Sequence, residues 1–112
     1  MIVVMHFAPE DETPFVPALE RALTTLAARP GYLGGRGGRS LDDPNAWILV
    51  TEWASVGAYR RALGSYEVKL HATPLLAQAL DRPSAFEELL DVDRSGILTR
   101  HASDRAENPV TG

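Results

Sequence analysis

The 112-residue chain contains no cysteine. Disulfide bonds, zinc–thiolate centres, iron–sulfur clusters and thiol nucleophiles are therefore excluded. A cysteine-free composition suits a reducing cytoplasm, and we expect the protein to act there. The sequence also lacks an apolar run long enough to span a membrane, and residues 1–7 are apolar without the basic lead or small-residue cleavage site of a signal peptide. We expect no membrane contact.

The sequence also has fewer basic than acidic residues. The sequence has 11 Lys and Arg residues against 15 Asp and Glu residues, so the net charge is -4 and the pI is about 5.3. Because nucleic-acid phosphates require a basic surface, we expect no nucleic-acid partner.

Clusters with metal-ligand spacing are not visible, and we predict no metal site. The run Asp91-Val92-Asp93-Arg94-Ser95-Gly96 begins like a calcium-binding loop, but its twelfth position is Ala102 where such a loop needs Glu. Glu87, Glu88 and Asp91 are interpreted as a solvated face and not as paired catalytic carboxylates.

Length and composition are those of one small globular domain, with 45% hydrophobic and 23% charged residues. A chain this short leaves much of its surface unburied, and a second copy covering an apolar face would add stability. A homodimer is therefore plausible before any motif is considered.

Hydrophobic periodicity and turn residues predict six elements in the order strand, helix, strand, strand, helix, strand. They are a strand over 1–7, a helix from Thr13-Pro14 to Leu26, a glycine-rich strand over 32–41, a strand over 46–54, a helix from Ser55 interrupted at Gly64 and resumed at Thr73-Pro74, and a strand over 84–92. This order predicts an α+β fold of the ferredoxin-like βαββαβ type with an antiparallel four-stranded sheet. Residues 1–92 would form the domain, and residues 93–112 a polar tail or an arm reaching a partner.

The strand over 46–54 carries apolar residues on both faces. One face holds Trp47, Leu49, Thr51 and Trp53, and the other holds Ile48, Val50, Glu52 and Ala54. An antiparallel strand with helices on one side and water on the other should alternate cleanly. We therefore expect a second copy of the chain to cover the face of Ile48 and Val50.

Two local motifs resemble the antibiotic biosynthesis monooxygenase family. The first is Pro30-Gly31-Tyr32-Leu33, which precedes the glycine-rich strand. The second is Glu52-Trp53-Ala54-Ser55-Val56-Gly57-Ala58-Tyr59-Arg60, which is similar to the family signature Trp-x-Ser-x-x-Ala-Tyr. The resemblance implies a dimeric α/β barrel, in which two four-stranded sheets meet face to face.

The same resemblance implies an enzyme that uses molecular oxygen without metal, flavin or haem. Enzymes of this family oxidise phenolic or anthrone-type polycyclic substrates to quinones. In the family, a Trp and a Tyr at the positions of Trp53 and Tyr59 contact the substrate between sheet and helices. The indole N–H can only donate a hydrogen bond, while a phenol can donate and accept, so each could stabilise a developing oxyanion.

Further candidates surround these two residues. Leu49 occupies the substrate-contacting position where well-studied members of the family carry Asn. His6 has the pKa range of a general base if it faces the cleft. Arg36 could meet an anionic substrate, and Tyr66 lies on the same helical stripe as Tyr59, although aromatic residues on such stripes more often serve packing.

Two alternatives stay open. Haem-degrading monooxygenases of this fold place a ligand His near the position of His71, so a haem-binding protein is one alternative to the cofactor-free enzyme. A dimeric module that binds a small ligand without catalysis is the other, because Leu49 replaces the family Asn and a fold does not determine a function.

Overall fold

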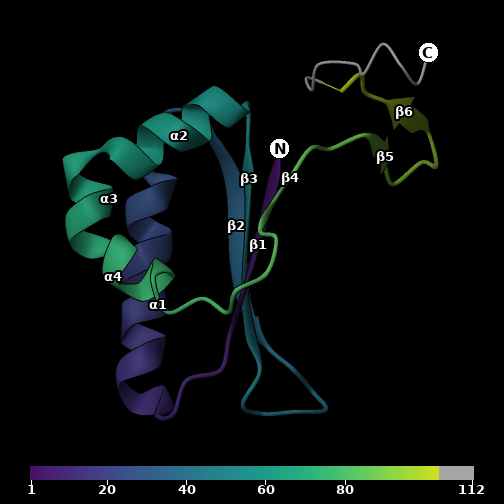
Figure 1. Cartoon of the computed structure of the whole chain (residues 1–112). Helices are drawn as coiled ribbons and strands as arrows, with labels where there is room; N and C mark the ends of the chain where they lie inside the picture. Colours follow the sequence, from purple (N-terminus) through teal and green to yellow (C-terminus); the bar gives the residue numbers. More distant parts are fainter. Residues whose placement is uncertain (104–112) are drawn as a thin grey trace, which may run out of the picture.

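Four strands form one antiparallel sheet in the order β2-β3-β1-β4 in the computed structural model, which describes residues 1–103 (Figure 1). The elements are β1 (Ile2–Phe7), α1 (Glu12–Ala27), β2 (Tyr32–Arg39), β3 (Trp47–Trp53), α2 (Val56–Gly64), α3 (Tyr66–His71), α4 (Thr73–Leu76), β4 (Ala85–Phe86), β5 (Leu90–Val92) and β6 (Leu98–Arg100). The predicted α+β ferredoxin-like fold is thus confirmed for β1 to β4. None of the helices within residues 1–103 has the length and apolar character needed to cross a membrane.

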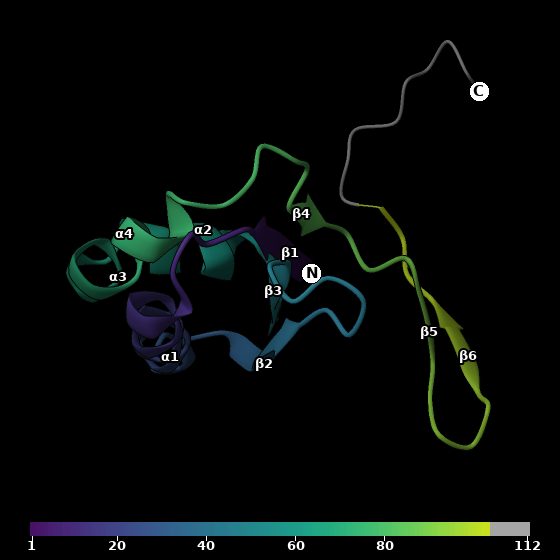
Figure 2. The same cartoon turned by 90° about the horizontal axis from the view of Figure 1, so that it is seen from below.

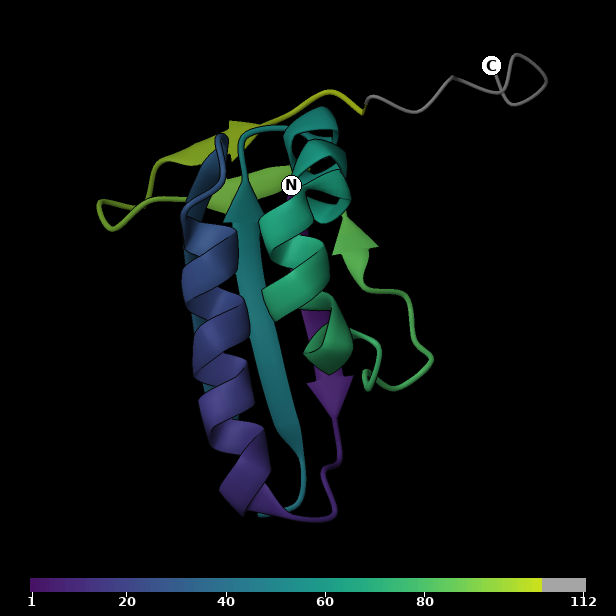
Figure 3. The same ribbon diagram turned by 90° about the vertical axis from the view of Figure 1, so that its left-hand side faces the viewer.

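All helices lie on one side of the four-stranded sheet (Figures 2 and 3). The core between the layers is made of the helix-facing residues of β1 and β3 and the apolar stripes of the helices. Its largest fully buried side chains are Trp53, Phe7, Leu26, Leu49 and Val68. The sheet face expected to hold Leu49, Thr51 and Trp53 is therefore the helix-covered face.

The opposite face of the sheet carries no helix. Strand register pairs His6 with Ile48 and Val4 with Val50, so these four side chains share that face. Ile48 is 39% exposed, and the other three are partly buried. A half-covered apolar strip consequently runs along the middle of the sheet, as the doubly apolar pattern of β3 predicts.

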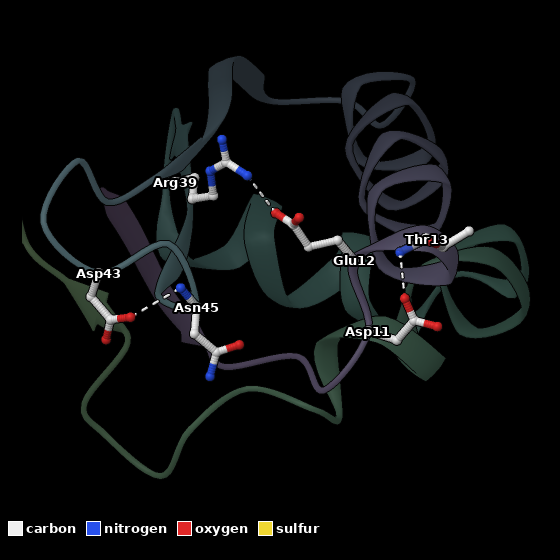
Figure 4. A network of polar contacts seen from close by, with 6 residues as sticks. All are labelled: Asp11, Glu12, Thr13, Arg39, Asp43 and Asn45. Atoms are coloured by element: carbon white, nitrogen blue, oxygen red, sulfur yellow. Dashed lines mark hydrogen bonds and ion pairs between the residues drawn. The ribbon is translucent and has the colours of Figure 1, made fainter.

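The first turn of α1 is fixed by acidic residues. Asp11 is the N-cap, and its Oδ1 accepts a hydrogen bond from the Thr13 backbone N–H at 3.0 Å (Figure 4). The helix therefore begins one residue before Thr13, the residue expected to cap it. Glu12 pairs with Arg39 of β2 at 2.7 Å, which ties the start of α1 to the end of the sheet.

A tight turn joins β2 to β3. The carboxylate of Asp43 accepts a hydrogen bond from the Asn45 backbone N–H at 3.0 Å, and the carbonyl of Asp43 accepts one from Ala46 at 2.9 Å (Figure 4). Asp and Asn favour such turns because their short side chains bond to nearby backbone groups. The turn holds β2 and β3 in register from Gly34 to Arg39.

Gly31 lets α2 approach the start of β2 closely. Its φ is +88°, and a Cβ at this position would lie 2.4 Å from the Cβ of Ala58. Both constraints require glycine, because an L side chain strains the backbone and would collide with α2. The Gly31 carbonyl accepts a hydrogen bond from the Ala54 N–H at 2.8 Å, which closes the corner between β3 and α2.

The second helical region consists of three short helices. Ser55 caps α2 by accepting a hydrogen bond from Ala58 N–H, and Ser65 caps α3 by accepting one from Val68 N–H. Gly64 ends α2, and Thr73 begins α4, as the sequence predicts. This helical region is interrupted at Ser65 and again at Ala72.

The prediction of a single strand over residues 84–92 is wrong. Only Ala85 and Phe86 pair with β1, because the chain then leaves the sheet edge through Glu87 and Glu88. Residues 90–100 form the β5–β6 hairpin, which lies beyond the sheet on the side away from the helices (Figure 2). We call residues 87–103 the arm.

The hairpin extends into the segment predicted as a polar tail or an arm. Residues 98–100 are a strand paired with β5, and the segment that begins like a calcium-binding loop forms the hairpin turn. Asp93 Oδ1 accepts hydrogen bonds from the backbone N–H groups of Ser95 at 2.9 Å and Ile97 at 3.0 Å. The rest of the predicted tail, 104–112, lies outside the described residues.

Candidate functional site

Three aromatic side chains meet on the helix-facing side of the sheet. The Trp53 ring lies 5.4 Å from the Tyr32 ring at 85° and 5.5 Å from the Tyr59 ring at 53°. Edge-to-face contacts of this kind are favourable for aromatic pairs. We call Tyr32, Trp53 and Tyr59 the aromatic cluster, which joins β2, β3 and α2.

The indole of Trp53 is fully enclosed, with 1% of the residue exposed. Its N–H donates to the Thr51 hydroxyl at 2.9 Å, two residues earlier on the same strand face. Thr51 is itself 2% exposed. In this closed form the indole N–H is occupied, while the Thr51 hydroxyl still has a hydrogen of its own to donate.

Burial raises the pKa of Tyr59 above its ordinary value of 10.0, because desolvation disfavours the phenolate. Burial raises the pKa of Tyr32 in the same direction. Both phenols are therefore neutral at physiological pH. Each can donate a hydrogen bond to a developing oxyanion, and neither is suited to act as a base there.

Leu49 lies on the same face as Thr51 and Trp53 and is 2% exposed. Its side chain belongs to the core cluster together with Leu19 and Phe7. The position where the family resemblance calls for an amide thus contains only apolar atoms, and the polar group nearest in sequence on this face is the Thr51 hydroxyl.

His6 and Arg36 lie on the opposite face of the sheet from the aromatic cluster. Arg36 pairs with Val50, and His6 with Ile48, in the register of that face. Within one chain, neither side chain reaches a substrate held between the sheet and the helices. The sheet itself separates the predicted base from Trp53.

His6 instead lines a pocket of about 470 Å³ at the β2–β3 turn end of the sheet. Arg39, Trp47 and Arg82 line the same pocket. Arg39 stands 5.6 Å over the Trp47 ring while it is paired with Glu12, and the buried Trp47 indole N–H has no partner within residues 1–103. This pocket is a second place where an aromatic compound could lie.

Tyr66 and His71 occupy the two ends of α3 and are both exposed, Tyr66 by 73%. They are not brought together with Trp53. His71 borders a pocket of about 240 Å³ between α1 and α4, below the roughly 300–1,000 Å³ of small-molecule sites. Within the described residues, the space beside His71 is therefore smaller than a typical small-molecule site.

Trp53 also borders a pocket of about 330 Å³ at the other end of the sheet. The remaining lining comes from Met1, from Leu33, from residues 52–56 and from arm residues Glu87, Glu88, His101 and Ala102. Tyr59 is not among the lining residues. This pocket is distinct from the space between Trp53 and Tyr59, which side chains fill.

The sequence pattern did not lead us to predict two residues of this site, Tyr32 and Thr51. Tyr32 directly follows Pro30-Gly31. Simple strand alternation through Gly34 and Gly35 does not place its side chain on the helix face, because that placement depends on the β-bulge between Tyr32 and Gly34. Thr51 shares a face with Trp53 by simple alternation, and that signal was available. A polar residue between Leu49 and Trp53 on a buried face indicates a partner for the indole.

Known proteins resemble the chain in sequence pattern and in fold. The family model of antibiotic biosynthesis monooxygenase matches residues 1–73. SnoaB of Streptomyces nogalater, a cofactor-independent oxygenase, superposes with a TM-score of 0.61 at 25% identity, over 70% of this chain and 81% of that one.

Two further structures share the fold. A conserved protein from Methanosarcina mazei Go1 has a TM-score of 0.61 at 21% identity, over 75% of this chain and 84% of that one. Rv0793 from Mycobacterium tuberculosis has a TM-score of 0.60 at 20% identity, over 95% and 97%. No curated protein is significantly similar to the chain. Since the family model spans well over half of the sequence and includes β1 to α3, the chain belongs to the antibiotic biosynthesis monooxygenase family.

Proposed function

We propose that the protein is a cofactor-independent monooxygenase that oxidises a hydrophobic phenolic or polycyclic aromatic substrate with O₂ to a quinone-type product. The observation that carries the proposal is the aromatic cluster of Tyr32, Trp53 and Tyr59 on the helix-facing side of a monooxygenase-family sheet. The likeness to SnoaB, itself a cofactor-independent oxygenase, supports the absence of a cofactor.

The reaction balances without a further reductant. An anthrone-type CH₂ group loses a proton, and the resulting anion passes one electron to O₂. The two radicals combine at carbon to a peroxide anion, which takes up a proton to become a hydroperoxide. Its O–O bond then breaks as the remaining C–H proton leaves and joins the departing hydroxide. One oxygen atom becomes the new carbonyl and the other departs as water, so the substrate supplies both electron pairs.

The protein binds and orients the substrate and excludes water from it. Tyr59 and Tyr32 are neutral phenols that can donate hydrogen bonds to the oxyanion formed by the first proton loss. Trp53 provides an aromatic surface held in place by Thr51. Proton removal by a general base on this face is not part of the proposal, since His6 lies on the other face. The proposal therefore requires a substrate acidic enough to lose its proton to water before it binds.

Substrate entry requires the helices to part from the sheet, because the cluster is packed in the closed form. The joints at Ser65 and Ala72 divide the covering helices into short pieces that can move separately. We propose that the α2–α3 region opens to admit the substrate and closes to exclude water.

A homodimer is part of the proposal. The uncovered sheet face bears Val4, Ile48 and Val50, and an apolar strip of this kind is stable in water when a second surface covers it. The family resemblance supplies the occupant, a second copy with its sheet facing the first. In that arrangement the arm, on the same side, would meet the partner.

Oxygen uptake with an anthrone and a hydroquinone panel tests this function. We expect metal-stripped protein to consume one O₂ per quinone formed, at a rate well above buffer. Uptake no faster than buffer across the panel, combined with saturable binding of the same compounds, would instead support a non-catalytic ligand-binding module. Leu49 in place of the family Asn is the observation that favours this second candidate.

Haemin titration addresses the other alternative. Because the pocket beside His71 is small, we expect no saturable shift of the haem absorption band on adding the protein. A shifted band that His71→Ala abolishes would overturn this expectation.

A further inference from the structure

We propose that the arm binds one divalent transition-metal ion, of the Zn²⁺ class, through Glu88, Asp91 and His101. One carboxylate oxygen from each acid and one imidazole nitrogen lie within 4.8 Å of one another. His101 Nε2 is 2.7 Å from Asp91 Oδ2 and 3.5 Å from Glu88 Oε2. These three ligand atoms are close enough together to share one ion after small side-chain movements.

The distances suit a tetrahedral ion. Zinc bonds to nitrogen and carboxylate oxygen of about 2.0–2.2 Å place neighbouring ligand atoms roughly 3.3–3.6 Å apart. The contact between His101 and Glu88 already has this length, and the contact between His101 and Asp91 needs to lengthen by roughly 0.6–0.9 Å. All three side chains are at the surface and can adjust.

The ligand types favour a transition-metal ion of intermediate softness, such as Zn²⁺, over a hard ion such as Mg²⁺ or Ca²⁺. Imidazole nitrogen suits zinc and neighbouring transition metals, whereas Mg²⁺ and Ca²⁺ prefer all-oxygen sets. Two carboxylates balance the charge of a divalent ion. A set of three protein ligands leaves the fourth position of a tetrahedral site open, as in catalytic zinc sites.

The neighbouring pocket is negatively charged, which is the second observation pointing to a cation. Glu88 and His101 line the 330 Å³ pocket, and Glu52 lines it too. Among the lining residues within 1–103, the fixed positive charge is the Met1 amino group, which donates to the Trp53 carbonyl at 3.1 Å. Two carboxylates, of Glu52 and Glu88, face this one cation, which favours a positive ion beside His101.

The ion would clip the two strands of the arm together. Glu88 precedes β5, Asp91 lies in β5, and His101 follows β6, with its N–H bonded to the Leu89 carbonyl at 2.9 Å. A two-stranded hairpin is marginally stable alone. Metal binding would therefore order the arm, and this role is separate from the oxygen chemistry assigned to the aromatic cluster.

Isothermal titration of the untagged, metal-stripped full chain with ZnCl₂ tests the proposal. We expect one ion per chain, with binding at least tenfold weaker for His101→Gln and for Glu88→Gln, and much weaker heat for MgCl₂ or CaCl₂. His101→Gln keeps a side chain that can hydrogen-bond to Asp91, so the hairpin is preserved while the imidazole ligand is lost. His71→Ala, which removes another exposed histidine, should change the affinity by less than twofold.

A second readout covers the case in which a variant loosens the hairpin. In NMR spectra of the wild-type chain, zinc should shift the His101 ring signals and slow amide exchange at Leu90 and Arg100, with no effect on His71. The proposal is overturned if wild-type binding does not saturate, if His101→Gln binds as tightly as wild type, or if His71→Ala causes the loss. Because no substrate is present, failure here leaves the oxygenase proposal untouched.

Discussion

The Trp53 indole N–H donates to the Thr51 hydroxyl across 2.9 Å in the interior of the protein. Both residues are at most 2% exposed, so neither group can turn to water instead. This bond fixes the indole plane against Tyr32 and Tyr59, and it links the strand pattern of β3 directly to the geometry of the candidate site.

Replacing Thr51 by Val should lower the free energy of unfolding by about 1–3 kcal/mol, because the indole N–H is left buried without a partner. Urea denaturation measures the change. Thr99→Val, at an exposed position of β6, is the matched control and should have almost no effect. In a Trp53→Phe background the Thr51→Val penalty should shrink; an equal penalty in both backgrounds would show that the bond is not its source.

Gly31→Ala should destabilise the protein by about 2–4 kcal/mol, since positive φ and overpacking against Ala58 act together. Gly96→Ala has a similar φ of +86° but open space around the added Cβ, so it isolates the backbone component. Thermal or urea unfolding should show Gly96→Ala costing only the backbone penalty of about 1–2 kcal/mol. Equal costs for the two variants would argue against the close approach of α2 to Gly31.

Burial raises the folded-state pKa of Tyr59 and Tyr32 above 10.0. Because the folded state holds these phenol protons more tightly than the unfolded state does, protonation of the phenols stabilises the folded state. This stabilisation is complete below pH 10 and is lost as the pH rises through the folded-state pKa. We therefore expect stability to fall above pH 10, and phenolate absorbance to show late-titrating groups. Tyr59→Phe and Tyr32→Phe should each remove one such group; unchanged titration curves would contradict their burial.

Sedimentation equilibrium should give twice the 12.2 kDa chain mass, because in the proposed homodimer a second copy covers the open sheet face. Ile48→Lys should shift the mass to that of a monomer, since a charge in the middle of the apolar strip must be desolvated. Leu41→Lys, in the fully exposed β2–β3 turn, is the control and should leave the dimer intact. A wild-type monomer at micromolar concentration would refute the covered face.

The four-stranded sheet could be predicted from the sequence because its signals are local. The alternation from Trp47 to Trp53, the helix cap at Ser55 and the helix end at Pro30-Gly31 each reflect a nearby physical constraint. The motif around Trp53 and Tyr59 likewise identified two residues that the structure brings into contact.

Long-range relationships were harder to predict. His6 was assigned to the cleft because alternation alone does not say which face the helices cover, and the register with Ile48 decides it. The β5–β6 hairpin was missed because Glu87 and Glu88 were interpreted as part of a continuous strand, although Asp93 to Gly96 carry ordinary turn chemistry. Asp91 and His101 are ten positions apart, and only the β5–β6 pairing brings them together.

The central claim is that the substrate reacts beside the aromatic cluster and not in the pocket of His6. It is tested most directly by comparing kcat/KM for oxygen uptake in Tyr59→Phe, Tyr66→Phe and His6→Gln. The account predicts a loss of about tenfold or more for Tyr59→Phe, with Tyr66→Phe and His6→Gln within twofold of wild type and all three equally folded by circular dichroism. Full activity in Tyr59→Phe together with a large loss in His6→Gln would contradict the account and move the reaction to the other face of the sheet.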